Sequence, residues 1–455
     1  MQPTWSLREK GQQLLTILWP IFITQLMIYS MSLVDTIMSG HAGTNDLAGV
    51  AIGSSLWTPI FSGVTGVLIA TTPIIAQHLG ANRRDKIPFT VIQGIYIAIA
   101  ISLFIIMGGT FVLKPILSNM NLDAPVRDIA YHYLMGLSIG IAPLFIYTIL
   151  RCFIESLGKT RITMMITLTS LPINVTLNYL LIFGKLGFPR LGGAGAGYAT
   201  GITYWCILLI TLWTVHKVKP FADYQVFKKW HPISLTAWKN QLQLGIPIGL
   251  SIFFEGSFFA AVTLLMSQYS TITIAAHQAA MNFASFLYMV PLSISMALTI
   301  AVGYEVGAKR YQDAKQYSFL GLGIALGLAV CCGVAILLFK EQVAGLYTQD
   351  RAVLQLSQQF LMFAIFFQLS DAIVTPVQGI LRGYKDVNIA SIVTFTSFWI
   401  VGLPLGHILS TYGSWGAFGY WIGFIVGLAI GAVFLLSRMV ILQRKVVARR
   451  LKPVC

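Results

Sequence analysis

Charged residues are scarce in this chain: they make up only 10% of its 455 residues, whereas hydrophobic residues make up 56%. A water-soluble protein of this length could not cover its surface with so few charges. Acidic residues are scarcer than basic ones, with 15 Asp and Glu against 30 Lys and Arg. The composition therefore excludes a soluble domain and predicts an integral membrane protein.

Cysteines are also few, and several well-known catalytic motifs are missing. The five cysteines show no CxxC or Cys/His spacing, so no disulfide framework or cysteine metal site is expected. The sequence contains no HExxH, GxSxG or Walker A motif, and GAGAGYATG (193–201) lacks the third glycine of a dinucleotide loop. We expect neither enzymatic activity nor a cofactor.

Long apolar runs dominate what is present. About 20 residues of helix cross a bilayer, and twelve runs of the chain are long enough. No small-residue cleavage site follows the first run, so we expect it to be retained as a span rather than removed as a signal peptide. The twelve predicted spans are 12–38, 46–76, 88–113, 128–150, 162–184, 194–216, 241–267, 273–303, 316–339, 353–381, 388–410 and 415–441.

The basic residues alternate between the two sides of these spans. Of the 30 Lys and Arg, 24 fall in the two termini and every second loop. The positive-inside rule then places both termini in the cytoplasm. The net charge of +15 is thus a topological signal, and basic clusters are expected near anionic lipid headgroups rather than on nucleic acid.

An internal repeat divides the chain into two halves. Gly80 and Gly307 begin matching basic loops at an offset of 227, and Pro20 and Pro247 share this offset. One offset shared by several elements indicates a duplicated unit of six spans. Because six is even, the two units enter the membrane in the same direction and are related by an axis along its normal.

Parallel repeats predict two lobes, with substrate held in a cleft between them and exposed alternately to each side as the lobes rock. A channel could also carry such repeats. The predicted lobes are residues 1–216 and 241–455. They are joined by a cytoplasmic linker, 217–240, expected to lie partly on the membrane surface with Trp230 and Trp238 at headgroup level.

Three carboxylates fall within predicted spans. Asp35 lies in the outer part of the first span, whereas Glu255 and Asp371 lie near the middle of the seventh and tenth. An acid at the bilayer centre costs about 2.5–3.5 kcal/mol on insertion scales and persists where it faces a bundle interior or an aqueous cavity. Glu255 and Asp371 are therefore functional candidates, or else structural carboxylates that bond to neighbours.

Asp35 is near enough to the outer end that it could instead snorkel to the interface. Polar residues expected at the same depth favour a site. Asn174 and Asn178 are one helical turn apart in the fifth span. Ala196 and Thr200 are one turn apart near the start of the sixth span. Carboxylate, amide and hydroxyl oxygens suit Na⁺ or a proton, and Asp35 with Asn178 would be the metal ligands. Alternatively, the asparagines only join helices.

The two central acids stand among aromatic residues. If Glu255 and Asp371 face each other, two anions in a low dielectric would favour binding of a proton or cation. Phenylalanines around them could hold a lipophilic cation by cation–π attraction, or could face lipid or fill a core. The candidates for lining a substrate site are Phe253, Phe254, Phe258, Phe259, Phe367, Gln278 and Asn282, and the candidate hinges are Pro20, Pro172 and Pro247.

Several motifs, taken in order, resemble the multidrug and toxic compound extrusion (MATE) family, in particular its NorM-like bacterial branch. They cover nearly the whole chain: VDTIMSGHAG (34–43), the paired GANR and GAKR loops, PINVTLNYLLIFG (172–184), AAHQAAMN (275–282) and LRGYKD (381–386). The resemblance implies a two-lobed bundle of twelve helices that exports organic cations and dyes in exchange for Na⁺ or H⁺.

By position, the resemblance assigns a first-lobe cation site to Asp35, Asn174, Asn178 and Thr200, with the carbonyl of Ala196. It assigns the second-lobe acids to Glu255 and Asp371. Phe367 replaces a tyrosine common in relatives, which removes a possible hydroxyl ligand. Glu155 would join a structural charge network with Arg151 and Lys159.

We therefore expect a monomeric secondary antiporter of small organic cations, in which drug and coupling ion compete for the same carboxylates. The architecture would also suit a lipid or lipid-linked oligosaccharide flippase, although such proteins usually have a more basic cavity. An uncoupled channel or receptor is the remaining alternative.

Overall fold

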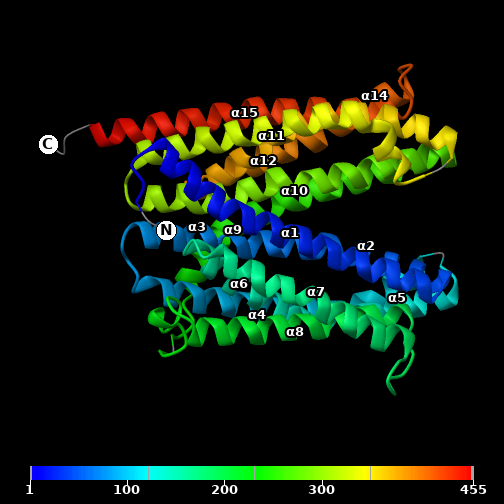
Figure 1. Cartoon of the computed structure of the whole chain (residues 1–455), viewed down its shortest axis with the longest axis horizontal. Coiled ribbons are helices and arrows are strands. Elements are labelled where there is room, and N and C mark those ends of the chain that lie inside the picture. Colours follow the sequence, from blue (N-terminus) through cyan, green and yellow to red (C-terminus); the bar gives the residue numbers. More distant parts are fainter. Residues whose placement is uncertain (1–2, 121, 230, 349, 452–455) are drawn as a thin grey trace. The chain divides into compact units, whose positions relative to one another are not determined.

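The computed structural model describes residues 3–120, 122–229, 231–348 and 350–451. Every regular element in these residues is helical, and Figure 1 shows long helices joined by short loops. In chain order the elements are α1 (Leu7–Ala42), α2 (Thr44–Ile69), α3 (Thr71–Gly80), α4 (Lys86–Asn119), α5 (Ala124–Ser138), α6 (Ile141–Ser156), α7 (Thr160–Phe183), α8 (Gly193–Lys217), the 3₁₀ helix η1 (Ala222–Tyr224), α9 (Leu235–Leu265), the 3₁₀ helix η2 (Met266–Gln268), α10 (Thr271–Gly307), α11 (Tyr311–Gly345), α12 (Arg351–Gly383), α13 (Asn388–Phe395), the π-helix η3 (Thr396–Gly402), α14 (Leu403–Thr411) and α15 (Phe418–Leu451).

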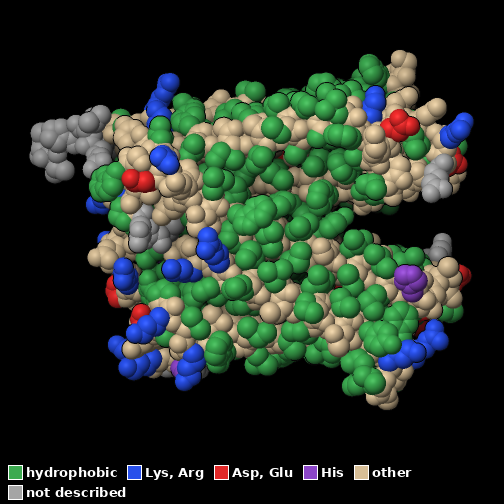
Figure 2. Space-filling view, in the orientation of Figure 1, with side chains coloured by type: hydrophobic (Ala, Val, Ile, Leu, Met, Phe, Trp, Pro, Cys, Tyr) green, Lys and Arg blue, Asp and Glu red, His purple; other side chains and the backbone are tan. Residues whose placement is uncertain are grey.

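The predicted spans reappear as these helices. Among the described residues, eleven helices are long and apolar enough to cross a membrane, and the bent pair α5 and α6 makes up to twelve. Their length and composition confirm the prediction of an all-α, multi-span membrane protein. Figure 2 shows hydrophobic side chains along the helices on the face drawn, with charged side chains gathered toward helix ends.

Three predicted spans are not single straight helices. The span predicted over 128–150 bends by 47° between α5 and α6, and the span predicted over 46–76 is broken at Ala70 between α2 and α3. The eleventh runs through α13, the π-helix η3 and α14. Pro404 is the second residue of α14, and because proline has no N–H it cannot donate a helical hydrogen bond back into η3.

The repeat at offset 227 extends to the backbone. Adding 227 to the ends of α2–α3, residues 44 and 80, gives 271 and 307, the ends of α10. The same shift takes the ends of α5–α6, residues 124 and 156, to 351 and 383, the ends of α12. The bent pair therefore corresponds to one unbroken helix in the second half, which supports counting it as one span.

Tight turns repeat as well. Asn82 and Lys309 both adopt a left-handed backbone conformation, with φ of 56° and 60°. Gly158 and Lys385 form a second such pair, with φ of 77° and 62°. Each pair is separated by 227 residues, so the structural partner of Lys385 is Gly158.

The chain packs into two compact units, which we describe separately. Unit 1 contains residues 1–18 and 250–455, and unit 2 contains residues 19–249. These divisions fall inside α1 and α9, two residues from Pro20 and from Pro247. The predicted lobes, 1–216 and 241–455, divide the chain at other residues and stay a prediction.

Polar contacts hold the start of α1 within unit 1. The Lys10 ammonium is fully buried and lies 2.9 Å from an oxygen of Asp313 on α11. The Tyr317 hydroxyl, also on α11, bonds with the side chains of Thr4 and Gln13. These contacts attach the N-terminal segment to α11.

The predicted linker belongs to unit 2. Gln93 of α4 donates to the carbonyl of Pro232 at 2.8 Å and accepts from the N–H of Ser234 at 2.9 Å. Phe221 is buried against Phe153 of α6. These contacts hold parts of the segment against α4 and α6. Its predicted place at the membrane surface stays a prediction, and Trp230 lies outside the described residues.

Candidate functional site

In unit 2 the predicted polar residues form one hydrogen-bonded cluster, which we call the Asp35 cluster. The Asn178 amide donates to Asp35 Oδ1 at 2.6 Å, and the Thr200 hydroxyl donates to Asp35 Oδ2 at 2.8 Å. Asn174 accepts from Asn178 at 3.0 Å and donates to Thr200 at 3.3 Å. Asp35 is only 6% exposed, so its carboxylate does not snorkel to the surface.

Local sequence sets the position of Thr200 in this cluster. The Asp46 carboxylate accepts a hydrogen bond of 2.6 Å from the N–H of Gly193, in the first turn of α8, where an anion stabilises the helix. A Cβ at Gly197 would lie 2.1 Å from the carbonyl oxygen of Tyr133, so only glycine allows α8 to approach α5 this closely. The glycines of GAGAGYATG therefore serve packing.

Two buried oxygen atoms in or next to the Asp35 cluster have no hydrogen-bond partner among the described residues. They are the amide oxygen of Asn178 and the hydroxyl oxygen of Ser39. Ser39 lies one turn after Asp35 on α1, on the same face. Buried oxygens without donors beside a carboxylate are suited to a hard monovalent cation or a proton.

The Ala196 side chain packs in a buried hydrophobic cluster with Val50 and Tyr133, and the ligand role of its carbonyl stays a prediction. Ser39 was not predicted, although its spacing of four residues from Asp35 in VDTIMS was a readable signal.

Unit 1 holds the other two acids. Glu255 on α9 and Asp371 on α12 are both buried, 9% and 1% exposed. The Thr375 hydroxyl donates to Asp371 Oδ1 at 2.7 Å, while Asp371 Oδ2 has no partner among the described residues.

Asp371 belongs to a polar stripe on α12 that the sequence analysis did not identify. Its members recur every three or four residues, so they share one helix face, and all are buried. The stripe ends in an arginine, which hydrogen-bonds Gln378 at 3.4 Å. The members are Gln368, Asp371, Thr375, Gln378 and Arg382.

The predicted aromatic residues divide into two groups. Phe258, Phe259 and Phe367 pack together, with ring centroids 5.9 Å apart for the first pair and 5.8 Å for Phe259 with Phe367. Phe253 is 41% exposed and lies outside this group, next to Phe254. The packed group also includes two rings that were not predicted, Phe398 and Phe424.

The remaining candidates from AAHQAAMN have different surroundings. Gln278 is half-buried and Asn282 is exposed on α10. His277 is buried and accepts a hydrogen bond of 3.1 Å from the Trp421 indole, consistent with a core histidine.

The charge network expected around Glu155 is present in part. Arg151 Nε lies 2.7 Å from Glu155 Oε1, and Thr163 also donates to Glu155. Arg151 reaches Gln25 of α1 at 3.2 Å. Lys159 forms no ion pair within the described ranges, so its inclusion was wrong.

The candidate hinges all lie inside helices: Pro20 in α1, Pro172 in α7 and Pro247 in α9. Proline removes one backbone hydrogen bond and weakens the helix locally. Pro20 and Pro247 stand where their helices pass from one unit to the other, whereas Pro172 lies within unit 2.

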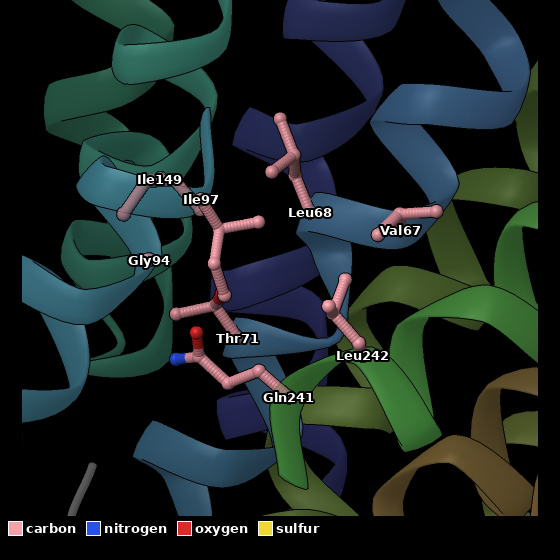
Figure 3. Close-up of a pocket in the computed structure, with 8 residues that line it drawn as sticks. All are labelled: Val67, Leu68, Thr71, Gly94, Ile97, Ile149, Gln241 and Leu242. Atoms are coloured by element: carbon pink, nitrogen blue, oxygen red, sulfur yellow. The ribbon is translucent and has the colours of Figure 1, made fainter. Parts of the chain in front are cut away.

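A small cavity in unit 2 lies apart from these residues. Figure 3 shows its lining, which includes Thr71, Gly94 and Gln241. Its volume is about 10 Å³, far less than the roughly 300–1,000 Å³ of pockets for drug-sized ligands. No group of three or more His, Cys, Asp or Glu able to hold a metal is found in the described residues.

Comparisons with known proteins identify the family. The MatE family model matches residues 20–180 and 247–408. A "Probable multidrug resistance protein NorM" of Halalkalibacterium halodurans is 60% identical over 98% of this chain and 97% of its own length. The protein of the same name from Bacillus subtilis is 56% identical over 98% of each chain.

Solved structures agree on the fold. An outward-facing MATE family transporter superposes with a TM-score of 0.88 at 17% identity, covering 98% of this chain and 99% of its own. The eukaryotic MATE transporter AtDTX14 superposes with a TM-score of 0.84 at 22% identity, covering 97% and 99%. This chain therefore belongs to the MatE family.

Proposed function

We propose that this chain is a NorM-type multidrug efflux transporter that exports lipophilic organic cations in exchange for Na⁺ or H⁺. The observation that carries the proposal is the Asp35 cluster, a buried carboxylate with two hydrogen bonds and unpartnered oxygens beside it. Relatives more than 50% identical over nearly the whole chain are named multidrug resistance proteins.

The proposed cycle depends on competition for negative charge. A coupling ion binds at the Asp35 cluster, or at Glu255 and Asp371, and neutralises carboxylates that otherwise attract the drug. Because ion and drug favour different conformations, each binding event shifts the population of states. The two units move relative to each other to alternate access, and Pro20 and Pro247 act as the hinges. The transporter works as a monomer with both termini in the cytoplasm.

Transport by the purified protein in liposomes tests this proposal. Uptake of a fluorescent organic cation is driven first by a Na⁺ gradient alone and then by a pH gradient alone. We expect one gradient to drive uptake and Asp35→Asn to abolish that response, while flux down the substrate's own gradient persists.

Three results would contradict the proposal. Flux that stays passive under both gradients would indicate a channel or receptor. Gradient-driven uptake unchanged in Asp35→Asn would remove the coupling role of the Asp35 cluster. Transfer of a labelled lipid between leaflets, without movement of the organic cation, would favour a flippase.

A further inference from the structure

The π-helix η3, in the middle of the eleventh span, contacts the helix that carries Glu255. The indole N–H of Trp399 on η3 donates to the carbonyl oxygen of Phe254 on α9 at 3.1 Å. This carbonyl belongs to the peptide bond that joins Phe254 to Glu255. The hydrogen bond therefore holds the peptide plane immediately before the Glu255 side chain.

Ring contacts from the same segment hold α9 on both sides of Glu255. The ring centroids of Phe395, the last residue of α13, and Phe254 are 4.8 Å apart, one residue before the acid. The ring centroids of Phe398 on η3 and Phe258 are also 4.8 Å apart, three residues after the acid. All of these residues belong to unit 1. The turn of α9 that carries Glu255 is thus held from both of its ends.

Neither an unsatisfied carbonyl nor anchoring at the membrane surface explains the indole bond. In a continuous α-helix such as α9, the Phe254 carbonyl also accepts from the backbone N–H four residues later, so it needs no second donor. Tryptophans that anchor a protein lie at headgroup level, whereas Trp399 lies midway along the predicted span 388–410. π-Helices are rare and occur frequently at functional sites.

The internal repeat supports a role in positioning. At the offset of 227, Trp399 corresponds to Pro172, so both units interrupt regular α-helical hydrogen bonding at the same place. In unit 2 the interrupted helix α7 contacts α1 through Asn178, which bonds to Asp35. In unit 1 the equivalent helix contacts α9, the counterpart of α1, through Trp399. In each unit the interrupted helix holds a helix that bears a buried acid.

We propose that Trp399 is a positioning residue that fixes the direction of the Glu255 side chain, so that this acid is oriented to bind the lipophilic cation. This inference rests on the proposed function, because it assigns Glu255 to substrate binding. Trp399 acts through the Phe254 carbonyl and is not itself a ligand of the substrate.

The experiment measures equilibrium binding of tetraphenylphosphonium, a lipophilic monocation, to the purified full-length chain. Trp399→Phe removes the indole N–H and keeps an aromatic ring. We expect its affinity for the probe to fall roughly three- to tenfold, the effect of losing one net hydrogen bond. Glu255→Gln alone should also weaken binding. In the Glu255→Gln background, Trp399→Phe should change the affinity less than twofold, because the acid that Trp399 positions is already gone.

The comparison of the two backgrounds separates positioning from general stability. Changes that act through one shared interaction are not additive, whereas independent effects on helix packing add. Trp421→Phe is the matched control, because it also removes an indole N–H that bonds within unit 1, to His277. Its affinity for the probe should stay within twofold of wild type.

A second variant tests the contact of α13 with the same turn of α9. Phe395→Leu removes the ring that packs against Phe254. We expect the same pattern, a several-fold loss of affinity that disappears in the Glu255→Gln background. This variant decides the question if Trp399→Phe does not fold.

An affinity within twofold of wild type in each folded variant of Trp399 and Phe395 would overturn the inference, and so would equal losses in both backgrounds. Either result leaves the proposed function intact. If Glu255→Gln alone binds the probe as tightly as wild type, the acid does not take part in substrate binding and the inference is wrong. If the wild-type chain does not bind the probe, the proposed function fails and this inference fails with it.

Discussion

At the scale of single residues, the Thr200 hydroxyl completes the Asp35 cluster. It donates to Asp35 and accepts from Asn174, and Thr200→Val keeps its shape while removing both bonds. A hydrogen bond to a charged group contributes about 1.5–3 kcal/mol. We expect Thr200→Val to weaken equilibrium binding of radioactive Na⁺ by at least tenfold.

Thr203→Val is the matched control. Thr203 is also buried on α8, but its hydroxyl donates only to the carbonyl of Ala199 on its own helix. Equal losses of Na⁺ binding in both variants would show that the hydroxyl contact with Asp35 is unimportant.

Helical spacing made the Asp35 cluster predictable. Asn174 and Asn178 differ by four residues, and the directions of the spans place Thr200 at the level of Asp35. Arg382 was missed because it was counted among loop charges, whereas α12 continues to Gly383. Charge alone does not reveal whether a basic residue at a helix end points into the bundle.

At the scale of elements, close helix packing depends on a few glycines. In Gly197→Ala the new Cβ would lie 2.1 Å from the carbonyl oxygen of Tyr133, and a backbone atom cannot rotate away. We expect overpacking to destabilise the protein by about 1–3 kcal/mol, measured as a lower melting temperature in detergent.

Gly327→Ala provides the opposite control. It lies within α11 with no atom within 4 Å of the added Cβ. Alanine is favoured over glycine in a helix by about 1 kcal/mol, so this variant should melt at the same or a higher temperature. A similar loss in both variants would contradict the packing argument.

Proline positions give a second prediction at this scale. Pro247→Ala restores the missing backbone hydrogen bond of α9 near its passage from unit 2 to unit 1. We expect a several-fold lower rate of gradient-driven transport with unchanged substrate affinity. Pro59→Ala within α2, which lies wholly in unit 2, should leave the rate nearly unchanged; a matching loss there would argue against a special role for Pro247.

The helices were predictable from hydropathy, but their bends were not. A Cβ at Gly140, where α5 and α6 meet, would lie 2.6 Å from the Cα of Gly201. The bend thus lies where the chain passes close to α8, a contact between residues far apart in sequence. Window hydropathy cannot detect such a contact, since both sides of the bend are equally apolar.

At the scale of the whole molecule, the repeat was the most informative sequence feature. The offset of 227 was predicted from a few short motifs. The same offset relates helix ends and left-handed turns of the first half to those of the second half. The division into units was less accessible, because it depends on which helices each part of α1 and α9 packs with. At the start of α1, Lys10 pairs with Asp313 of α11, and nothing in their local sequences links them.

This pair supports a last prediction, which concerns how α1 joins the two units. Asp313→Asn keeps the size of the side chain but leaves the fully buried Lys10 without its carboxylate. Removing one partner of a buried ion pair costs about 3–5 kcal/mol, partly offset here because Asp313 is 22% exposed. We expect a lower melting temperature and earlier cleavage of the N-terminal segment by protease.

Transport should fall in Asp313→Asn although no residue of either candidate site has changed. Residues 7–18 of α1 belong to unit 1 and the remainder of the helix belongs to unit 2, so releasing the first segment uncouples the helix from one of its units. The double variant Lys10→Met/Asp313→Leu replaces the pair by apolar contacts, which often restores stability. If this double variant regains both melting temperature and transport, the attachment itself is what matters. If it regains stability but not transport, the charges act in the transport cycle, and α1 is more than a mechanical link.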